Sequence, residues 1–243
     1  MKIFVVDVGN SNSVFGLFEG TRLRWQRRCE TAKTVSLVKK IGLKRVDGVA
    51  VASVVPSLDR TLKQILAKKF GVTPLFVSSR ITLPIKLKVR KPSQVGADRI
   101  ANVVGAWMRF QKACIVVDFG TATTFDVISA KGEYLGGPIA PGIGIANAAL
   151  HEKTAKLPLV PIMPPRRVIG KETRECIQSG VLYGYAGLVE GLIARIKKEY
   201  GRPMRVIATG GLAPLILPHC CSIKATDPFL TLEGLKIIYK LHA

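Results

Sequence analysis

An internal repeat constrains the fold of this chain more than any other feature of its sequence. Residues 4–13 read FVVDVGNSNS, and residues 115–124 read IVVDFGTATT. At a constant offset, the corresponding pairs are Asp7 and Asp118, Gly9 and Gly120, and Ser13 and Thr124. In each copy an apolar run leads into Asp-x-Gly and then into a second apolar run, which predicts two strands joined by a tight polar turn. We therefore expect two related halves.

Helices and strands alternate around the two turns. The remaining apolar patterns predict further strands at residues 21–28, 46–55, 74–79, 133–137 and 205–209. Helical spacing predicts helices at residues 57–71, 97–111, 143–152, 171–199 and 230–242. Helices that cross between strands indicate an α/β fold. Because no Pro-, Gly- or Ser-rich linker separates the halves, we expect one domain over residues 1–113 and another over 114–243, with a hinge near 112–114.

The chain is strongly basic. Its 37 Lys and Arg residues against 16 Asp and Glu residues give a formal net charge of +21, so a polyanionic partner or an anionic substrate has to be considered. The cations are spread along the chain instead of forming a tail, and no clustered aromatic residues accompany them. This dispersal favours a solvated surface over a nucleic-acid-binding face, which stays the alternative.

Cysteine usage and hydropathy bear on the cellular compartment. Five cysteines, with no CxxC pair and no Cys/His ligand spacing, argue against a secreted disulfide framework and against a structural zinc site. No apolar stretch reaches the roughly 18 residues of a membrane span, and the N-terminus enters a strand pattern at once instead of a signal sequence. We expect a soluble cytoplasmic protein with no membrane partner.

The two repeated turns have the chemistry of an anion site. Gly9 and Gly120 allow the backbone to approach a ligand closely, and the amides and hydroxyls that follow them can donate to phosphate oxygens. Asp7 and Asp118, at the strand ends, supply the oxygen ligands that hard cations prefer. A single Asp-x-Gly is a common turn without a ligand, but its duplication favours a polyphosphate held by both turns. Neither a P-loop nor a G-x-G-x-x-G motif occurs.

Two further segments have both a functional and a structural interpretation. The Thr-Gly-Gly turn at residues 209–211 ends an apolar strand, and it is either a slot for a purine or ribose or an ordinary strand-to-helix turn. Asp98 and Arg99 follow Gly96 where a loop passes into a helix. Asp98 is either a proton acceptor or a helix N-cap, and Arg99 either binds an anion or lies on the surface.

Six motifs occur in register along the chain. They are DVGNS at residues 7–11, VGADRIAN at 95–102, DFGTATT at 118–124, GGPIAPG at 136–142, TAKLP at 154–158 and TGG at 209–211. Each motif is weak by itself. Together, in this order and spacing, they resemble the type III pantothenate kinases over nearly the whole chain, from Met1 to about Leu235.

This resemblance implies a fold and a reaction. The fold would be that of the actin, sugar-kinase and Hsp70 superfamily, with two duplicated RNase H-like domains and ATP bound in the cleft between them. The reaction would be transfer of the γ-phosphoryl group of ATP to the primary hydroxyl of pantothenate, the first step of coenzyme A synthesis. The alternative is an ATP-binding regulator of the same fold that lacks pantothenate kinase activity.

The resemblance also assigns ATP and cation contacts. The ATP contacts would be Asp7, Val8, Gly9, Asn10, Ser11, Asn12, Ser13 and Val14 in the first phosphate loop, with Thr121, Gly210 and Gly211. Asp118 would bind the monovalent cation, potassium or ammonium, that the family requires alongside magnesium. Asp7 would hold Mg²⁺ through water or phosphate.

The pantothenate contacts follow from the same resemblance. They would be Val89, Gly96, Ala97, Asp98, Arg99 and Thr173. Asp98 would be the proton acceptor. Many members have an aromatic residue where this chain has Val89 and Asn where it has Lys91, so we expect a differently built pantothenate wall.

The long helical stretch from about Lys171 to Tyr200 carries more apolar surface than one buried stripe needs. Its apolar positions are Ile177, Val181, Leu182, Tyr185, Leu188, Val189, Leu192 and Ile196. From the pattern alone, the helix is either buried within one chain or partly covered by a partner. The family resemblance favours a homodimer in which Thr173 of one chain reaches Asp98 and Arg99 of the other.

Overall fold

The structure, a computed structural model, describes residues 1–43 and 45–243. Contacts divide the chain into two units. Unit 1 comprises Met1–Gln111, Ile128–Leu135 and Phe229–Ala243, and unit 2 comprises Lys112–Val127 and Gly136–Pro228. The C-terminal helix therefore belongs to unit 1 by its contacts. The predicted boundary at 113/114 divides the chain into two consecutive halves, and this division stays a prediction.

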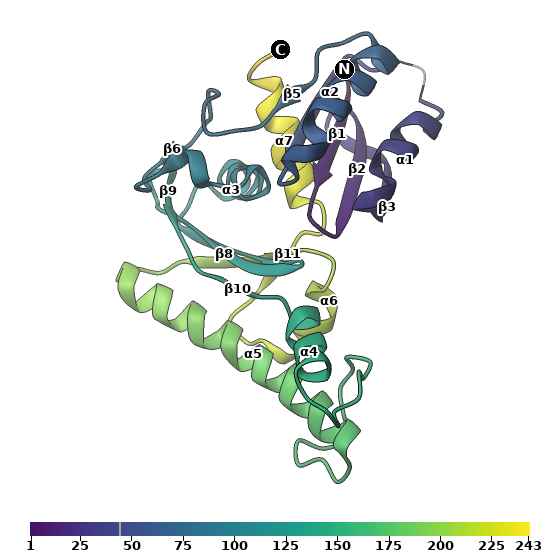
Figure 1. Cartoon of the computed structure of the whole chain (residues 1–243). Coiled ribbons are helices and arrows are strands. Elements are labelled where there is room, and N and C mark those ends of the chain that lie inside the picture. The colour runs from purple at the N-terminus through teal and green to yellow at the C-terminus, as the bar shows by residue number, and fades with distance from the viewer. Residues whose placement is uncertain (44) are drawn as a thin grey trace. The chain divides into compact units, whose positions relative to one another are not determined.

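Unit 1 is built on a five-stranded sheet with the order β3-β2-β1-β4-β5 (Figure 1). The strands are β1 (Lys2–Val8), β2 (Asn12–Glu19), β3 (Arg22–Glu30), β4 (Gly48–Ser53) and β5 (Leu75–Phe76). β1 pairs antiparallel with β2 and parallel with β4, and Val8 lies opposite Ser53. The carboxyl ends of β1 and β4 therefore lie at the same edge of this sheet, where the first repeated turn begins.

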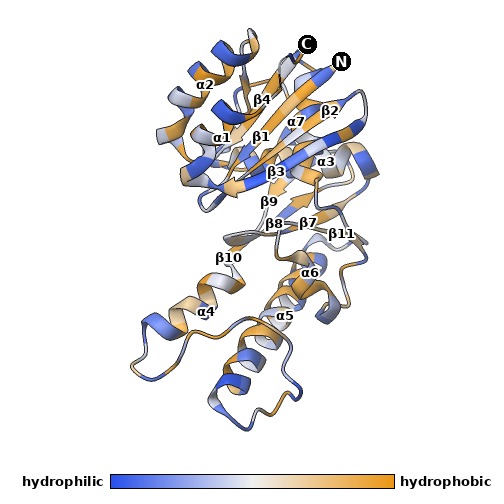
Figure 2. Cartoon of the chain, turned by 90° about the vertical axis from the view of Figure 1, so that its right-hand side faces the viewer, coloured by the Kyte–Doolittle hydropathy of each residue, from blue (hydrophilic) through white to orange (hydrophobic). Residues whose placement is uncertain are grey.

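Helices cover both faces of this sheet, which explains why Ile3 to Val6 of β1 are all fully buried. One face packs against α1 (Thr34–Lys40) and α2 (Pro56–Phe70), and the other contacts α3 (Ala97–Phe110) and α7 (Leu230–Lys240). In Figure 2, β1 is largely orange, whereas the edge strand β3 shows blue stretches at its exposed arginines.

The backbones of α3 and α7 approach one another closely. A Cβ atom at Gly234 would lie 1.9 Å from the carbonyl oxygen of Ala101, and one at Gly105 would lie 2.7 Å from the carbonyl oxygen of Leu230. A larger residue at either position would push the helices apart, because packed interiors have little room to yield. This contact fixes α3, whose first turn contains Asp98.

Unit 2 repeats the strand order of unit 1. Its strands are β7 (Cys114–Phe119), β8 (Ala122–Ile128), β10 (Ile139–Pro141), β11 (Arg205–Thr209) and β12 (Ala225–Thr226). The order β12-β11-β7-β8 corresponds to β5-β4-β1-β2, and β11 is parallel to both β7 and β12. β10 pairs with β8. The duplicated sequence thus folds into duplicated topology.

One long helix packs against the sheet of unit 2. The helices of this unit are α4 (Ile143–Glu152), α5 (Thr173–Tyr200), α6 (Ala213–Ile216) and the short 3-10 helix η3 (Leu217–His219). Leu182, Val189 and Ile193 of α5 are buried in the same core as the sheet residues Ile115 and Val117. Gly201, in the left-handed conformation with φ of 72°, ends α5.

The remaining short elements lie in or next to unit 1. They are β6 (Lys86–Leu87), β9 (Glu133–Gly136) and the 3-10 helices η1 (Thr31–Lys33) and η2 (Pro92–Gln94). β6 pairs parallel with β9. The sequence did not predict β6, β10, β12 or α1, because elements this short carry too few residues to show a period. Among the described residues, no helix has the length and apolarity needed to cross a membrane.

Candidate functional site

The first repeated turn is braced by the segment that follows β3. The Gly9 N–H donates to the carbonyl of Asn12 over 3.0 Å, which closes the turn between β1 and β2. The Thr31 N–H donates to the carbonyl of Ser11 over 3.0 Å, and the Thr31 hydroxyl donates to the carbonyl of Gly9 over 2.6 Å. No local sequence pattern marks Thr31, because its hydrogen bonds reach back over about twenty residues. Thr31 thus stabilises the conformation of this turn.

The predicted phosphate-binding residues of this turn differ in exposure. Asn10 and Ser11 are exposed, and Asp7 is half-buried at the end of β1. Ser13 is fully buried, and its hydroxyl lies 2.6 Å from that of Thr34. The Ser13 hydroxyl therefore bonds within the interior of unit 1, whereas the outward-facing groups of the turn are those of Asn10 and Ser11.

Asp98 lies in the first turn of α3, where Gly96 is the residue that precedes the helix. The Arg99 N–H donates to Oδ1 of Asp98 over 2.7 Å. A Cβ atom at Gly96 would lie 2.4 Å from the same oxygen, so a larger residue there would displace the carboxylate from this position. Burial raises the pKa of Asp98, against the lowering effects of the Arg99 N–H bond and the Arg99 charge. A carboxylate with a raised pKa is a better proton acceptor.

Unit 1 brings Asp98 to the same sheet edge as the first turn. The Val54 N–H donates to the carbonyl of Val8 over 3.0 Å, immediately before the turn at Gly9. A Cβ atom at Gly96 would lie 3.6 Å from a methyl group of the same Val54. Val54 thus links the phosphate-type turn to the loop that carries Asp98. Two sequence-predicted sites, separated by about ninety residues, converge at one sheet edge.

The second repeated turn is also closed by a backbone hydrogen bond from its glycine, but to the second residue after it instead of the third. The Gly120 N–H donates to the carbonyl of Ala122 over 3.1 Å, and the Gly142 N–H donates to the carbonyl of Thr121 over 3.1 Å. A Cβ atom at Gly142 would lie 2.2 Å from that Thr121 oxygen, so a glycine is required before α4. Sequence reasoning assigned no role to Gly142 itself. Thr121 is exposed at the tip of the turn.

The Thr-Gly-Gly turn joins the second repeated turn within unit 2. Thr209 lies opposite Asp118 in the β11–β7 register, and the Leu212 N–H donates to the carbonyl of Phe119 over 3.2 Å. Gly210 has φ of 92°, and a Cβ atom there would lie 2.5 Å from Oδ1 of Asp118. The Asp118 carboxylate thus rests against bare backbone. Asp118, Thr121 and Gly210 gather at one edge of this sheet.

A cation fits the oxygen groups around Asp118 better than a zinc-type site would. The described residues contain no group of three or more His, Cys, Asp or Glu side chains that could hold a metal ion. A Cβ atom at Gly120 would lie 3.8 Å from Oδ1 of Asp118 and 3.3 Å from the carbonyl oxygen of Ala122, so the oxygens here are a carboxylate and a backbone carbonyl. Such a donor set suits a weakly demanding, oxygen-liganded ion, and it leaves Mg²⁺ to be held mainly by phosphate and water.

Thr173 lies apart from the second turn. It begins α5 and is exposed, and it lines a groove of about 560 Å³ between α5 and the segment from α4 to Leu157. Tyr185, farther along α5, lines the same groove, and its hydroxyl is hydrogen-bonded to that of Thr123 in β8. Twelve residues of helix separate Thr173 from Tyr185, which is about 18 Å. Within unit 2, Thr173 is therefore remote from the phosphate-type turn.

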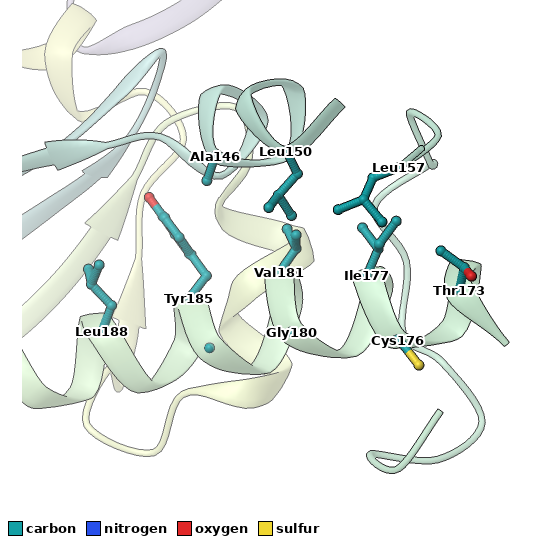
Figure 3. Close-up of a pocket in the computed structure, with 11 residues that line it drawn as sticks. Ala146, Leu150, Leu157, Thr173, Cys176, Ile177, Gly180, Val181, Tyr185 and Leu188 are labelled. Carbon is teal, nitrogen blue, oxygen red and sulfur yellow. The ribbon is translucent and has the colours of Figure 1, made fainter. Parts of the chain in front are cut away.

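The groove beside α5 is apolar along most of its length (Figure 3). In the close-up, Leu150 and Leu157 point toward Ile177 and Val181 of α5. Thr173 and the exposed Cys176 lie at one end, and Leu188 lies at the other. Leu150 and Leu188, which line this groove, are each 37% exposed. Of the apolar α5 positions named from the sequence, Leu188 is exposed, Leu192 and Ile196 are half-buried, and the others are buried within the chain, so a partner over this helix stays a prediction.

Curated relatives of this chain share one description. The family model described as type III pantothenate kinase matches residues 3–195. The relative named Type III pantothenate kinase from Moorella thermoacetica is 46% identical over 250 residues, which cover 98% of both chains. The relative of that name from Myxococcus xanthus is 44% identical over 249 residues, which cover 98% of this chain and 97% of the relative.

Solved structures share the fold at low sequence identity. A protein of Campylobacter jejuni, described as a Baf family transcriptional activator, superposes with a TM-score of 0.66 at 21% identity over 98% of both chains. The activator of 2-hydroxyisocaproyl-CoA dehydratase from Clostridium difficile, solved with ADPNP bound, superposes with a TM-score of 0.56 at 12% identity. It covers 100% of this chain and 97% of that one. At these identities the likeness concerns the fold alone.

The raised pKa of Asp98 leads to a prediction about stability. A carboxyl whose pKa is raised in the folded state binds its proton more tightly there than in the unfolded chain, so its ionisation destabilises the fold as pH rises above the ordinary value of 3.8. Asp98→Asn keeps an oxygen for the Arg99 N–H but cannot ionise. We expect its melting temperature to exceed that of the wild type at pH 7, with the difference shrinking as pH falls toward 4.

Thermal denaturation between pH 4.5 and 8 measures this difference. Glu199→Gln, at an exposed carboxyl near the end of α5, is the control and is expected to show no such trend. An Asp98→Asn protein that is less stable than the wild type at pH 7 would show that the carboxylate acts as a stabilising helix cap instead.

Proposed function

The chain belongs to the type III pantothenate kinase family, and we propose how its residues divide the work of ATP-dependent phosphorylation of pantothenate. In this reaction, the bond between the γ-phosphorus of ATP and its bridging oxygen breaks. A new bond forms from the primary hydroxyl of pantothenate to that phosphorus, giving ADP and 4'-phosphopantothenate, the first intermediate on the way to coenzyme A. The fold is the actin-like ATPase and sugar-kinase fold that the sequence motifs implied.

The two repeated turns bind the phosphates of ATP in this proposal. The loop from Asp7 to Val14 contacts the phosphate oxygens, mainly through donors of the exposed Asn10 and Ser11, because the Ser13 hydroxyl is bonded to Thr34. Thr121 contributes from the second turn. Gly210 and Gly211 leave space for the nucleoside. The bracing of the first turn by Thr31 supports this division, because donors that are already fixed lose little freedom when they bind.

Asp98 accepts the proton of the attacking hydroxyl, and Arg99 binds the substrate carboxylate. The observation that carries this assignment is the convergence of Asp98 and the first turn on Val54 at one sheet edge. Gly96, Ala97 and Val89 form the pantothenate wall beside them. Phosphoryl transfer depends mainly on alignment and charge neutralisation, so the base adds a smaller factor to the rate.

Two cations complete the charge balance of the proposal. Asp118 would hold a monovalent cation near the phosphates, supported by the position of its carboxylate near the end of β7, beside the second turn. Asp7 holds Mg²⁺ through water or phosphate oxygens. When bound, these ions neutralise charge that accumulates on the phosphates.

A second copy of the chain covers the α5 groove and completes the pantothenate site. The exposed Leu150 and Leu188 and the distance of Thr173 from the second turn both support this homodimer. Thr173 of one subunit then contacts the pantothenate held by Gly96 to Arg99 of the other. Each site would contain residues of both chains.

An ATP-binding regulator of the same fold is not favoured by any observation. The Campylobacter structure carries a regulator's description, but at 21% identity it shows the fold alone. Relatives at 43–46% identity are described as kinases instead. A cytoplasmic location stays a prediction, supported by the five cysteines, which form no disulfide among the described residues. The predicted lack of a nucleic-acid partner also stays a prediction.

The first test of the proposal concerns Asp98. Asp98→Asn is expected to keep the Kd for ATP and for pantothenate within about twofold while lowering kcat by roughly 10²-fold or more. Coupled measurement of ADP release, with and without pantothenate, gives the rate, and titration calorimetry gives the two affinities. Full activity in this variant would contradict the assignment of Asp98 as the proton acceptor and would favour its role as a helix cap.

The second test concerns Asp118. The wild type is expected to be several times more active in potassium or ammonium chloride than in sodium chloride at equal ionic strength. Asp118→Ala should lose this preference, because the carboxylate ligand is gone. Glu199→Ala, at an exposed carboxyl of the same unit, should retain it. An unchanged ion preference in Asp118→Ala would make Asp118 a structural residue.

The third test concerns the homodimer. Asp98→Asn and Thr173→Trp chains are each expected to be inactive, the second because a bulky side chain blocks the pocket. Mixed after mild dissociation, they should recover about a quarter of the wild-type activity, because half of the random dimers contain one site with both residues intact. Sedimentation of an active monomer, or hybrids that form without recovery, would contradict the shared site.

A further inference from the structure

The guanidinium of Arg99 lies over the ring of Tyr134. The Cζ atom of Arg99 is 5.8 Å from the centre of that ring, within the range of a cation–π interaction. Tyr134 is 1% exposed, so the ring is held by its surroundings and cannot follow the arginine. The two residues are 35 positions apart, and both belong to unit 1. The sequence motifs gave Tyr134 no role.

The backbone around Tyr134 also holds the segment that leads to Val89. The Lys86 N–H donates to the carbonyl of Gly132 over 3.0 Å, and the Lys88 N–H donates to the carbonyl of Tyr134 over 2.8 Å. Leu87 lies opposite Tyr134 in the parallel β6–β9 register. Tyr134 therefore contacts Arg99 through its ring and Lys88, the residue before Val89, through its backbone.

The turn before Tyr134 is also held in place, by a contact with α3. Gly132 has φ of 72°, and a Cβ atom there would lie 2.7 Å from the indole of Trp107 in α3. Ser129 closes the turn, because its hydroxyl accepts from the N–H groups of Lys131 and Glu133 over 3.1 and 3.2 Å. α3 carries both Arg99 and Trp107. The contact at Trp107 therefore holds β9, which contains Tyr134, against the helix that bears Arg99.

We propose that Tyr134 is a positioning residue for pantothenate recognition, which holds the Arg99 guanidinium in the orientation that binds the substrate carboxylate. An arginine side chain has many rotamers, and ordering it upon binding weakens affinity. A contact with a buried ring orders the arginine beforehand, so less freedom is lost when the guanidinium binds a carboxylate. This inference rests on the proposed role of Arg99 in the kinase reaction.

The ring of Tyr134, and not its hydroxyl, is the group that matters in this arrangement. Tyr134→Phe keeps the ring and is expected to leave the KM for pantothenate within about twofold of the wild type. Tyr134→Leu removes the ring and is expected to raise that KM about fivefold to tenfold, the factor that a moderate cation–π contact represents. The KM for ATP and the kcat at saturating pantothenate should stay within twofold in both variants, because the phosphate turns are untouched.

An uncharged substrate separates recognition of the carboxylate from general damage to the pocket. Pantothenol has the same primary hydroxyl as pantothenate but an alcohol in place of the carboxylate. Its KM should be high in the wild type and should not rise further in Tyr134→Leu. In an Arg99→Ala background, Tyr134→Leu should likewise leave the KM for pantothenate unchanged, because the two substitutions break one interaction.

Stability controls keep the test interpretable. Phe70→Leu removes a buried ring from α2 of the same unit, and it should lower the melting temperature while leaving the KM for pantothenate unchanged. If Tyr134→Leu does not fold, Tyr134→Met fills the site with an unbranched apolar chain and takes its place.

Three results would overturn the inference while the wild type remains active on pantothenate. They are an unchanged KM in the Leu variant, an equal rise for pantothenate and pantothenol, and a Phe variant that behaves like the Leu variant. A wild type that consumes no ATP with pantothenate would instead contradict the proposed function.

Discussion

Parallel pairing of β1 with β4, and of β7 with β11, is the constraint on which each half of the site depends. Because parallel strands end at the same sheet edge, Val8 meets Ser53 in one unit and Asp118 meets Thr209 in the other. Every sequence-predicted group of the phosphate chemistry follows one of these ends. A tight turn then follows each Asp-x-Gly, and it leaves Asn10, Ser11 and Thr121 exposed while Ser13 and Thr123 are buried.

Glycines set how closely these groups can approach the backbone. At Gly96, Gly142 and Gly210, an added Cβ atom would lie within 2.5 Å of an oxygen of Asp98, Thr121 or Asp118, respectively. Each glycine thus places an oxygen against bare backbone at a predicted site residue. The same requirement recurs between α3 and α7, where Gly234 lets two helices meet and so fixes the first turn of α3. Both the site and the core therefore depend on glycines, at positions where a side chain would not fit.

Local patterns predicted the parts of the structure whose cause is local. The repeated β-turn-β units, the amphipathic helices and the loop-to-helix position of Asp98 all followed from short stretches of sequence. The contacts that shape the site were not predictable in this way. Thr31 reaches back to Gly9, and Tyr134 reaches Arg99 across 35 positions, and neither has a residue type or spacing that marks it. Such contacts arise from the register of the sheets, which a single sequence does not specify.

The length of α5 connects the assembly to the chemistry. About 18 Å of helix separates Thr173 from Tyr185, which is bonded to β8 beneath the second turn. Thr173 therefore lies far from the second turn of its own unit 2. The same stretch of α5 that creates this distance also lines the apolar groove. If a second chain covers the groove, the same interface would bury the leucines that line the groove and would place Thr173 at the partner's site. The long helix then both stabilises the dimer and delivers a substrate contact to the partner's site, so loss of the interface would also remove part of the pantothenate pocket.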